Sequence, residues 1–95
     1  MIKLNDTLIS LEICEEMWLP ESRSVMFAKM GSEIFLNLSS SHHQLRKLKK
    51  RYGLIKHFTD TAGGLYIYSN FHGCDGTRLY FDGSASVCFN GEFIA

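Results

Sequence analysis

Cys14 is the residue of this sequence best placed for covalent chemistry. It ends segment 7–14, which is rich in β-branched and large apolar residues and short enough to be a buried strand. Pro20 marks a turn shortly after it. A strand end and the turn that follows present side chains and free backbone N–H groups at one point, where a thiol can attack an electrophile. Free cysteines are also often small buried apolar residues, so position alone leaves both interpretations open.

Two acidic residues directly follow Cys14 in the chain. The negative charges of Glu15 and Glu16 disfavour a thiolate beside them. A nucleophilic Cys14 therefore requires a positively charged partner.

The elements that must position Cys14 alternate between strand and helix. We expect a strand over 7–14, a short helix from Pro20 that ends at Gly31, a strand over 33–38, a helix over 42–61 and a strand over 65–69. A Gly-rich loop then leads to short strands and tight turns: loop 70–76, strands 79–81, 86–89 and 92–94, and turns 82–83 and 90–91. This order predicts an α/β fold in one domain.

The expected helix 42–61 has a start signal, an apolar stripe and a basic face. Ser41 is the expected N-cap. Apolar residues recur at three- and four-residue spacing: Leu45, Leu48, Tyr52 and Ile55. Gly53 indicates a kink or a close contact. Six of the ten basic residues fall in this region, and we interpret them as a solvated helix face, not a nucleic-acid surface: Arg46, Lys47, Lys49, Lys50, Arg51 and Lys56.

Composition and charge are those of a globular segment. Of the 95 residues, 45% are hydrophobic, and ten basic residues balance ten acidic ones, so net charge favours neither nucleic acid nor membrane. No apolar stretch approaches the roughly 20 residues of a membrane span, and the N-terminus lacks a signal-peptide pattern. Three cysteines without a CxxC pair favour a reducing compartment, by default the cytoplasm.

Metal binding is an alternative chemistry for the histidines and cysteines. Zinc sites usually show closely spaced ligand pairs, and only His72 and Cys74 approach that spacing. His42 and His43 are adjacent on the expected helix and cannot both face one site. The remaining candidate ligands are His57 and Cys88. We therefore expect no metal site.

A family resemblance adds to these interpretations. Segment 12–18, EICEEMW, resembles the nucleophile motif of eukaryotic-type glutamine-dependent NAD synthetases, which belong to the nitrilase, or carbon–nitrogen hydrolase, superfamily. Further blocks resemble the family in the same order and at family-like spacing: 37–43, 45–47, 63–68, 73–76, 78–80, 82–84 and 90–91. Because these blocks extend over nearly the whole chain, the resemblance is specific.

The resemblance implies hydrolysis of glutamine, which supplies ammonia for the amidation of deamido-NAD to NAD. It implies that Cys14 is the catalytic nucleophile, whose thiolate forms a thioester with the glutamine carboxamide. It also implies that the backbone N–H of Glu15 helps to hold the oxyanion.

Substrate contacts are carried over from the same family motifs. Glu15 matches the acid that binds the glutamine α-ammonium group, and Ser41 matches a hydroxyl for the α-carboxylate. Arg46 or Lys47 supplies the cation, and we favour Arg46 because an arginine can bind a carboxylate in bidentate geometry. Trp18 either lines this pocket or packs in the core.

Parts of the family pattern are missing from this sequence. The family's catalytic glutamate and lysine lie well upstream of the cysteine motif, whereas only thirteen residues precede Cys14 here. The resemblance places ATP and magnesium in a synthetase domain that we do not expect in this chain, so we expect no cofactor. The family's hydrolase domain is an αββα sandwich, of which residues 1–95 match roughly the second half; such a half exposes an apolar sheet face.

Two alternatives to a glutamine-hydrolysing fragment stay open. The chain can be a non-catalytic truncated module, or a fragment of another carbon–nitrogen hydrolase such as a nitrilase or amidase. The expected partner is glutamine, without nucleic acid or membrane, and the family is homo-oligomeric.

Overall fold

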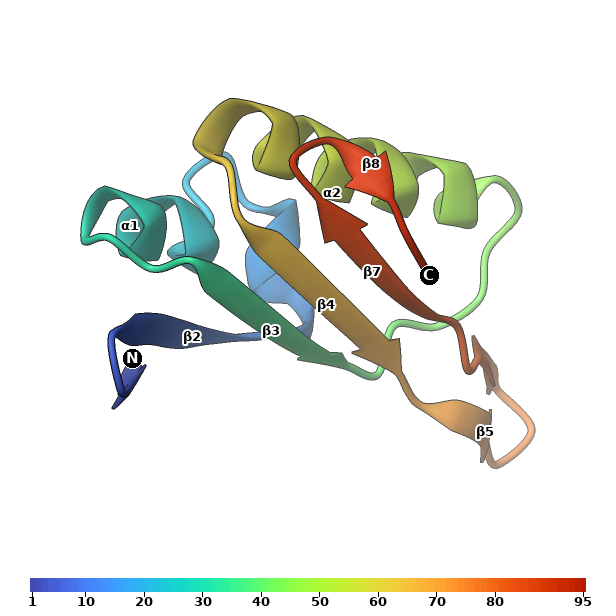
Figure 1. Cartoon of the computed structure of the whole chain (residues 1–95). Coiled ribbons are helices and arrows are strands. Elements are labelled where there is room, and N and C mark those ends of the chain that lie inside the picture. Colours follow the sequence, from blue (N-terminus) through green and yellow to red (C-terminus); the bar gives the residue numbers. More distant parts are fainter.

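A six-stranded sheet with helices packed on one face forms the body of the molecule (Figure 1). The computed structural model describes residues 1–95. The strands lie side by side in the order β1 (Ile2–Leu4), β2 (Thr7–Ile13), β3 (Ile34–Ser39), β4 (Leu65–Asn70), β7 (Ala85–Phe89) and β8 (Glu92–Phe93). A separate hairpin of β5 (His72–Asp75) and β6 (Leu79–Asp82) extends from the end of β4.

The three central strands run parallel, and helices connect them. Between β2 and β3 lie a 3-10 helix, η1 (Cys14–Trp18), and α1 (Arg23–Lys29). Helix α2 (Lys47–Ala62) connects β3 to β4. Both connections lie on the same side of the sheet, where α1 contacts α2. The carboxyl ends of β2, β3 and β4 therefore meet at one edge, where α/β proteins usually bind ligands.

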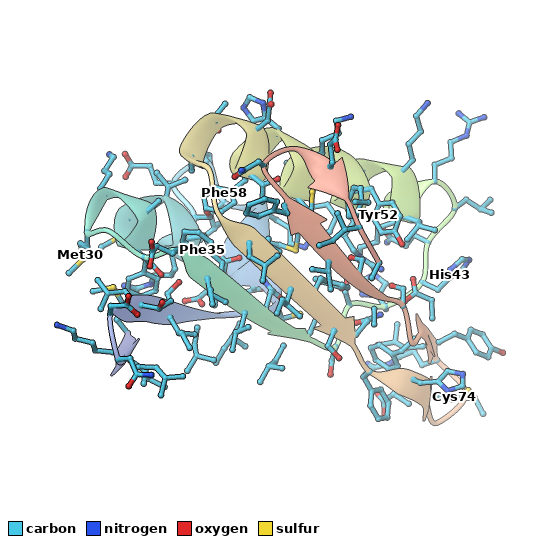
Figure 2. All side chains as sticks on the ribbon, in the orientation of Figure 1. Met30, Phe35, His43, Tyr52, Phe58 and Cys74 are labelled. Carbon is cyan, nitrogen blue, oxygen red and sulfur yellow. The ribbon has the colours of Figure 1, made fainter.

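The two faces of the sheet differ in polarity because strand residues alternate in direction. The face under the helices holds the buried core, in which the Phe35 and Phe58 rings pack edge to face at 4.8 Å between centroids (Figure 2). The opposite face carries rows of aligned apolar side chains, none of them buried: Ile9, Ile34, Leu65 and Phe89, then Leu11, Leu36, Ile67 and Val87. The expected exposed apolar face is thus confirmed.

The structure confirms the α/β fold and most of the predicted strands. Two further pairings were not predicted. Residues 70–76, expected to be a loop, include the end of β4 and the whole of β5, and the N-terminus adds β1 as an antiparallel edge strand. Neither helix has the length and hydrophobicity that spanning a membrane requires.

The start of the second helix was predicted wrongly. Helix α2 begins at Lys47, and its N-cap is Arg46 in the left-handed conformation, with φ of 65°, so Ser41 is not the cap. The backbone of Ser41 instead bonds to the Asn70 side chain, and the His43 N–H donates to the Tyr80 carbonyl. Because this pairing holds the chain extended, the helix cannot form until several residues later.

The buried face of α2 also differs from the predicted stripe. Ile55 is buried as predicted, but Leu45 is 91% exposed and Leu48 is also exposed. The other residues buried on this helix are polar, including Arg51, which the sequence placed on the solvated face. Gly53 lies on the exposed side of an uninterrupted helix and marks neither a kink nor a close contact.

We predict that Gly64→Ala destabilises the fold. Gly64 has φ of +91°, and a Cβ there would lie 2.6 Å from the Glu33 carbonyl oxygen. Strained backbone of this kind costs about 1–3 kcal/mol, and the clash adds to it. Urea unfolding should therefore show a free energy lower by about 2 kcal/mol or more. Gly53→Ala, in open helix surface, is the control and should raise the unfolding free energy by about 0.5–1 kcal/mol. Equal stability of the two variants would contradict the described backbone.

Candidate active site

Cys14 occupies a sharp turn between a strand and a helix. It is the first residue of η1, directly after β2, and has φ of 46°, a conformation uncommon outside glycine. The Glu16 carboxylate fixes this turn: it accepts a hydrogen bond from the Ile13 N–H at 2.8 Å and pairs with Arg23 at 3.3 Å. The first N–H groups of such a helix have no partner within it, so the N–H of Glu15 can donate to a bound group.

A groove of about 430 Å³ opens beside Cys14 at the carboxyl edge of the sheet. Its size is within the range of small-molecule sites. The lining comes from the ends of the parallel strands and the residues just after them: Ile13, Leu38, Ser39, Ser40, Ser69, Asn70 and Phe71. The groove therefore places the Cys14 thiol among hydroxyl and amide groups that can bind a polar substrate.

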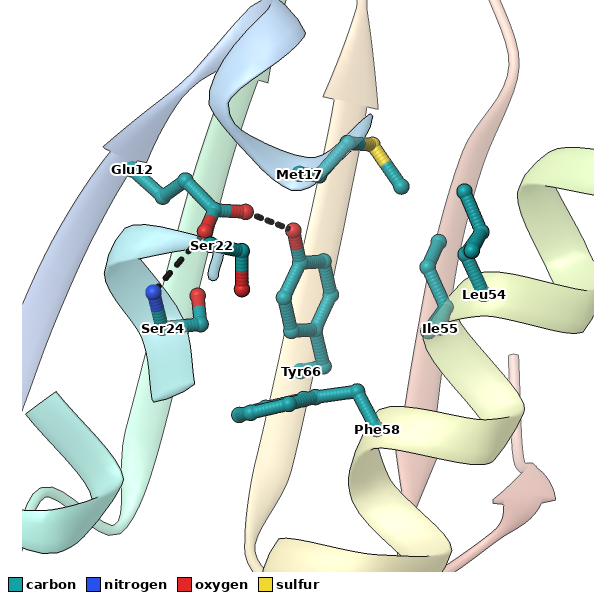
Figure 3. A pocket seen from close by; sticks show the side chains of 8 residues that line it. All are labelled: Glu12, Met17, Ser22, Ser24, Leu54, Ile55, Phe58 and Tyr66. Carbon is teal, nitrogen blue, oxygen red and sulfur yellow. Dashed lines mark hydrogen bonds between the residues drawn. The ribbon is translucent and has the colours of Figure 1, made fainter. Parts of the chain in front are cut away.

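A buried carboxylate lies beneath this turn, two residues before the cysteine. The Glu12 side chain is only 2% exposed. It accepts hydrogen bonds from the Tyr66 hydroxyl at 2.6 Å, the Asn37 amide at 3.0 Å and the Ser24 N–H at 2.9 Å (Figure 3). Burial raises the pKa of Tyr66, and the negative charge of Glu12 raises it further, so the phenol remains protonated and donates.

Lys47, at the start of α2, is a cation whose charge interacts with that of Cys14. Burial lowers the pKa of Lys47, and the nearby Arg51 lowers it further, while a Cys14 thiolate and Asp82 act in the opposite direction. Its ammonium group donates to the His42 carbonyl oxygen at 3.1 Å. A nucleophilic Cys14 needs a positive partner, and Lys47 in the first turn of α2 is the candidate for it.

Trp18 packs against the core, one of the two roles predicted for it. Its ring also lies under two ammonium groups, at 5.6 Å from Lys47 Nζ and 5.8 Å from Lys50 Nζ. Cation–π contacts of this kind restrict where a lysine side chain can point. Trp18 therefore helps to orient Lys47, and it does not line the groove beside Cys14.

The remaining predicted substrate residues lie at different depths. Glu15 is exposed next to Cys14 in the chain. Ser41 is buried and does not line the groove, although Ser39, two residues earlier, does. Arg46 is exposed in the loop before α2, and it lines a pocket with Trp18 and Lys47 that does not include Cys14. The charge of Lys47 interacts with that of Cys14, and the choice between Arg46 and Lys47 as the carboxylate ligand stays a prediction.

Several polar residues of the site were not predicted: Glu12, Asn37, Asn70, Asp82 and Arg51. One signal for the first three was present in the sequence. Polar residues recur at every second position of strands that otherwise read as apolar, as Ser10 and Glu12 do in β2. Such alternation indicates a strand with one polar face. Nothing in the sequence indicates which of its faces the helices cover.

The structure contains no cluster of three or more His, Cys, Asp or Glu side chains suited to holding a metal ion. All three cysteines are free: Cys14 is half-buried, Cys74 is exposed and Cys88 is buried. Figure 2 shows Cys74 on the hairpin, far from the core residue Phe35.

Comparison with known proteins matches the whole chain to one family. Residues 1–95 match the sequence profile of the carbon–nitrogen hydrolases. A glutamine-dependent NAD(+) synthetase of Dictyostelium discoideum is 50% identical over 95 residues, covering 100% of this chain and 13% of the relative. The crystal structure of a glutamine-dependent NAD(+) synthetase from Cytophaga hutchinsonii superposes with a TM-score of 0.82 at 26% identity, over 99% of this chain and 14% of that one.

The fold is shared more widely than the sequence. An amidase of the nitrilase superfamily from Nesterenkonia superposes with a TM-score of 0.80 at 21% identity, over 99% of this chain and 35% of that one. The strand-end cysteine and the sheet with its helices are those of a carbon–nitrogen hydrolase. The chain belongs to this family, and it spans about one seventh of the length of the synthetases it matches.

We predict that Glu12→Ala destabilises the protein strongly. The substitution leaves three donors buried without an acceptor, at about 1–3 kcal/mol for each unsatisfied group. Urea unfolding should show a loss of about 3 kcal/mol or more. Glu15→Ala removes the same side chain from an exposed position and should change the unfolding free energy by less than about 0.5 kcal/mol. A loss for Glu12→Ala no larger than that for Glu15→Ala would contradict the role of this carboxylate.

Proposed function

We propose that this chain carries the nucleophile and part of the substrate site of a glutamine-hydrolysing enzyme that supplies ammonia for NAD synthesis. The main support is the Cys14 turn: a strained strand end with free N–H groups, a groove beside the thiol and a lysine whose charge interacts with that of Cys14. Identity of 50% to a glutamine-dependent NAD(+) synthetase over the whole chain favours glutamine as the substrate.

The proposed reaction runs through a thioester. The Cys14 thiolate attacks the side-chain carboxamide carbon of glutamine, and the carbonyl oxygen becomes an oxyanion that the Glu15 N–H stabilises. The C–N bond then breaks, and the nitrogen takes up a proton and leaves as ammonia. Water hydrolyses the thioester to release glutamate and the thiol. The family resemblance assigns the base for both proton transfers to a glutamate upstream of the cysteine motif, at a position outside residues 1–95.

Recognition of the amino-acid end of glutamine follows from the charges around the groove. The exposed Glu15 carboxylate is suited to the α-ammonium group, and the 41–47 segment is suited to the α-carboxylate. We assign the cation of that subsite to Lys47, because it is half-buried with its ammonium group over the Trp18 ring and its charge interacts with that of Cys14, whereas Arg46 is exposed. The ammonia would be used in a synthetase domain that binds ATP and magnesium. Free cysteines fit a reducing compartment such as the cytoplasm.

Labelling with an electrophilic glutamine analogue tests the nucleophile. In protein expressed with its natural flanking sequence, we expect one equivalent of label on Cys14, detected by peptide mass spectrometry. Cys14→Ser should abolish both this label and ammonia release. Cys74→Ser, which removes the most exposed cysteine, is the matched control and should leave both unchanged. Labelling that persists in Cys14→Ser, or moves with Cys74, would refute the assignment.

The carboxylate subsite is tested by comparing neighbouring cations. Lys47→Met should lower kcat/KM for glutamine about 10- to 100-fold, because a hydrogen bond to a charged group contributes about 1.5–3 kcal/mol. Arg46→Met should change it less than about threefold, since a solvent-exposed charge contributes little. The measurement is steady-state ammonia release over a range of glutamine concentrations. The opposite ranking would return the subsite to Arg46.

A further inference from the structure

The side chain of Asn70 forms two hydrogen bonds with the backbone of Ser41. Its Oδ1 accepts a hydrogen bond from the Ser41 N–H at 2.8 Å, and its Nδ2 donates to the Ser41 carbonyl at 3.0 Å. Asn70 is the last residue of β4, and Ser41 lies just beyond the end of β3. The amide thus takes the place of a strand partner where the regular ladder ends. Both residues are buried, so neither bond is replaced easily by water.

The orientation of the Asn70 amide is set by a second group of residues. Asp82 Oδ1 accepts from Asn70 Nδ2 at 2.7 Å, which directs the amide oxygen toward the Ser41 N–H. Ser84 donates to the same carboxylate oxygen from its N–H at 3.1 Å and its hydroxyl at 2.9 Å. Burial raises the pKa of Asp82, but the hydrogen bonds from Asn70 and Ser84 and the charge of Arg51 outweigh it and hold that pKa well below the usual range.

Arg51 anchors this group to the helix that carries Lys47. Its guanidinium is fully buried, donates to Asp82 Oδ2 at 3.1 Å and to the Ser84 hydroxyl at 2.7 Å, and lies 4.8 Å from the centre of the Tyr68 ring. Lys47 and Arg51 are one turn apart on α2, so they lie on the same side of the helix. The ion pair therefore connects the positions of Ser41 and Lys47, the two residues assigned to the α-carboxylate.

We propose that Asn70 is a positioning residue for substrate binding, with Asp82 and Arg51 holding its amide in the required orientation. The proposal rests on the proposed glutamine hydrolysis. Asn70 lines the groove beside Cys14 and fixes the segment that binds the α-carboxylate, but it has no part in the attack on the carboxamide. Loss of its side chain therefore weakens glutamine binding and leaves the chemical step and the thiol largely intact.

A purely structural role for Asn70 predicts something different. Its own backbone N–H bonds to the Ser84 carbonyl at 2.9 Å and is retained in any substitution, so β4 keeps its end. If the side chain only stabilised the fold, Asn70→Ala would lower the amount of active protein and thus kcat, with KM unchanged. A positioning role raises KM at nearly constant kcat.

The test uses protein expressed with its natural flanking sequence, with ammonia release measured against glutamine concentration. Asn70→Ala should raise KM about tenfold, change kcat less than about threefold and leave the rate of Cys14 alkylation by iodoacetamide unchanged. Protection of Cys14 from iodoacetamide by L-glutamate, which keeps the α-carboxylate, should require about tenfold more ligand. Asn70→Ala with KM within twofold of the wild type, or with kcat and alkylation reduced together, would overturn the proposal.

Exchanging the side chains of Asn70 and Asp82 tests whether the orientation of the Asn70 amide, and not only its size, is required. Asn70→Asp places two carboxylates in contact and should raise KM more than Asn70→Ala does. Adding Asp82→Asn restores a hydrogen bond between the two positions and should lower KM again by at least threefold. No recovery in the double variant would contradict the role given to Asp82. Wild-type protein that labels at Cys14 but releases no ammonia from glutamine would instead refute the proposed function, and the positioning role with it.

Discussion

The buried carboxylate of Glu12 is the constraint on which the site depends. A charge removed from water costs several kcal/mol unless it is hydrogen-bonded or paired. Glu12 is stabilised by three donors that come from three different elements: Ser24 at the start of α1, Asn37 in β3 and Tyr66 in β4. Those elements are therefore held in fixed positions relative to β2. Because Cys14 follows two residues later, the same hydrogen bonds fix the end of the strand and the position of the Cys14 thiol.

This arrangement also explains an unusual distribution of polarity over the sheet. The covered face carries Ser10, Glu12, Asn37 and Tyr68 among the core aromatics, and the open face carries isoleucine, leucine and valine. In a soluble two-layer protein the opposite is expected, with the apolar face against the helices. At the carboxyl edge of the sheet, the groove beside Cys14 has both polar and apolar lining residues. The open face has the composition of a surface that another layer covers, in keeping with a chain that spans only part of the length of its relatives.

The sequence predicted those features that depend on local signals and missed those that depend on distant partners. Strands β3 and β4 and the turn after Cys14 follow from apolar runs and from Pro20, so they were predicted within a few residues. Ser41 has the local character of an N-cap, but the side chain of Asn70, 29 residues away, forms hydrogen bonds with its backbone N–H and carbonyl groups. Arg51 belongs to a basic run, yet Asp82, 31 residues away, pairs with it and buries it. The start of α2 at Lys47, with Arg46 as its left-handed N-cap, also has no local signal in the sequence.

The two polar networks hold opposite sides of the groove, and β3 joins them. On one side, Glu12 fixes the strand end that carries Cys14; on the other, Asn70 and Asp82 fix the segment that carries Ser41. Asn37 donates to Glu12, its amide oxygen accepts from the Ser39 hydroxyl at 2.6 Å, and the Ser39 carbonyl accepts from the Phe71 N–H at 2.8 Å. The separation between nucleophile and substrate-binding segment is thus set by directional hydrogen bonds and not by apolar packing. Since hydrogen bonds weaken steeply with misalignment, this design defines the position of a small polar substrate more narrowly than side-chain packing would.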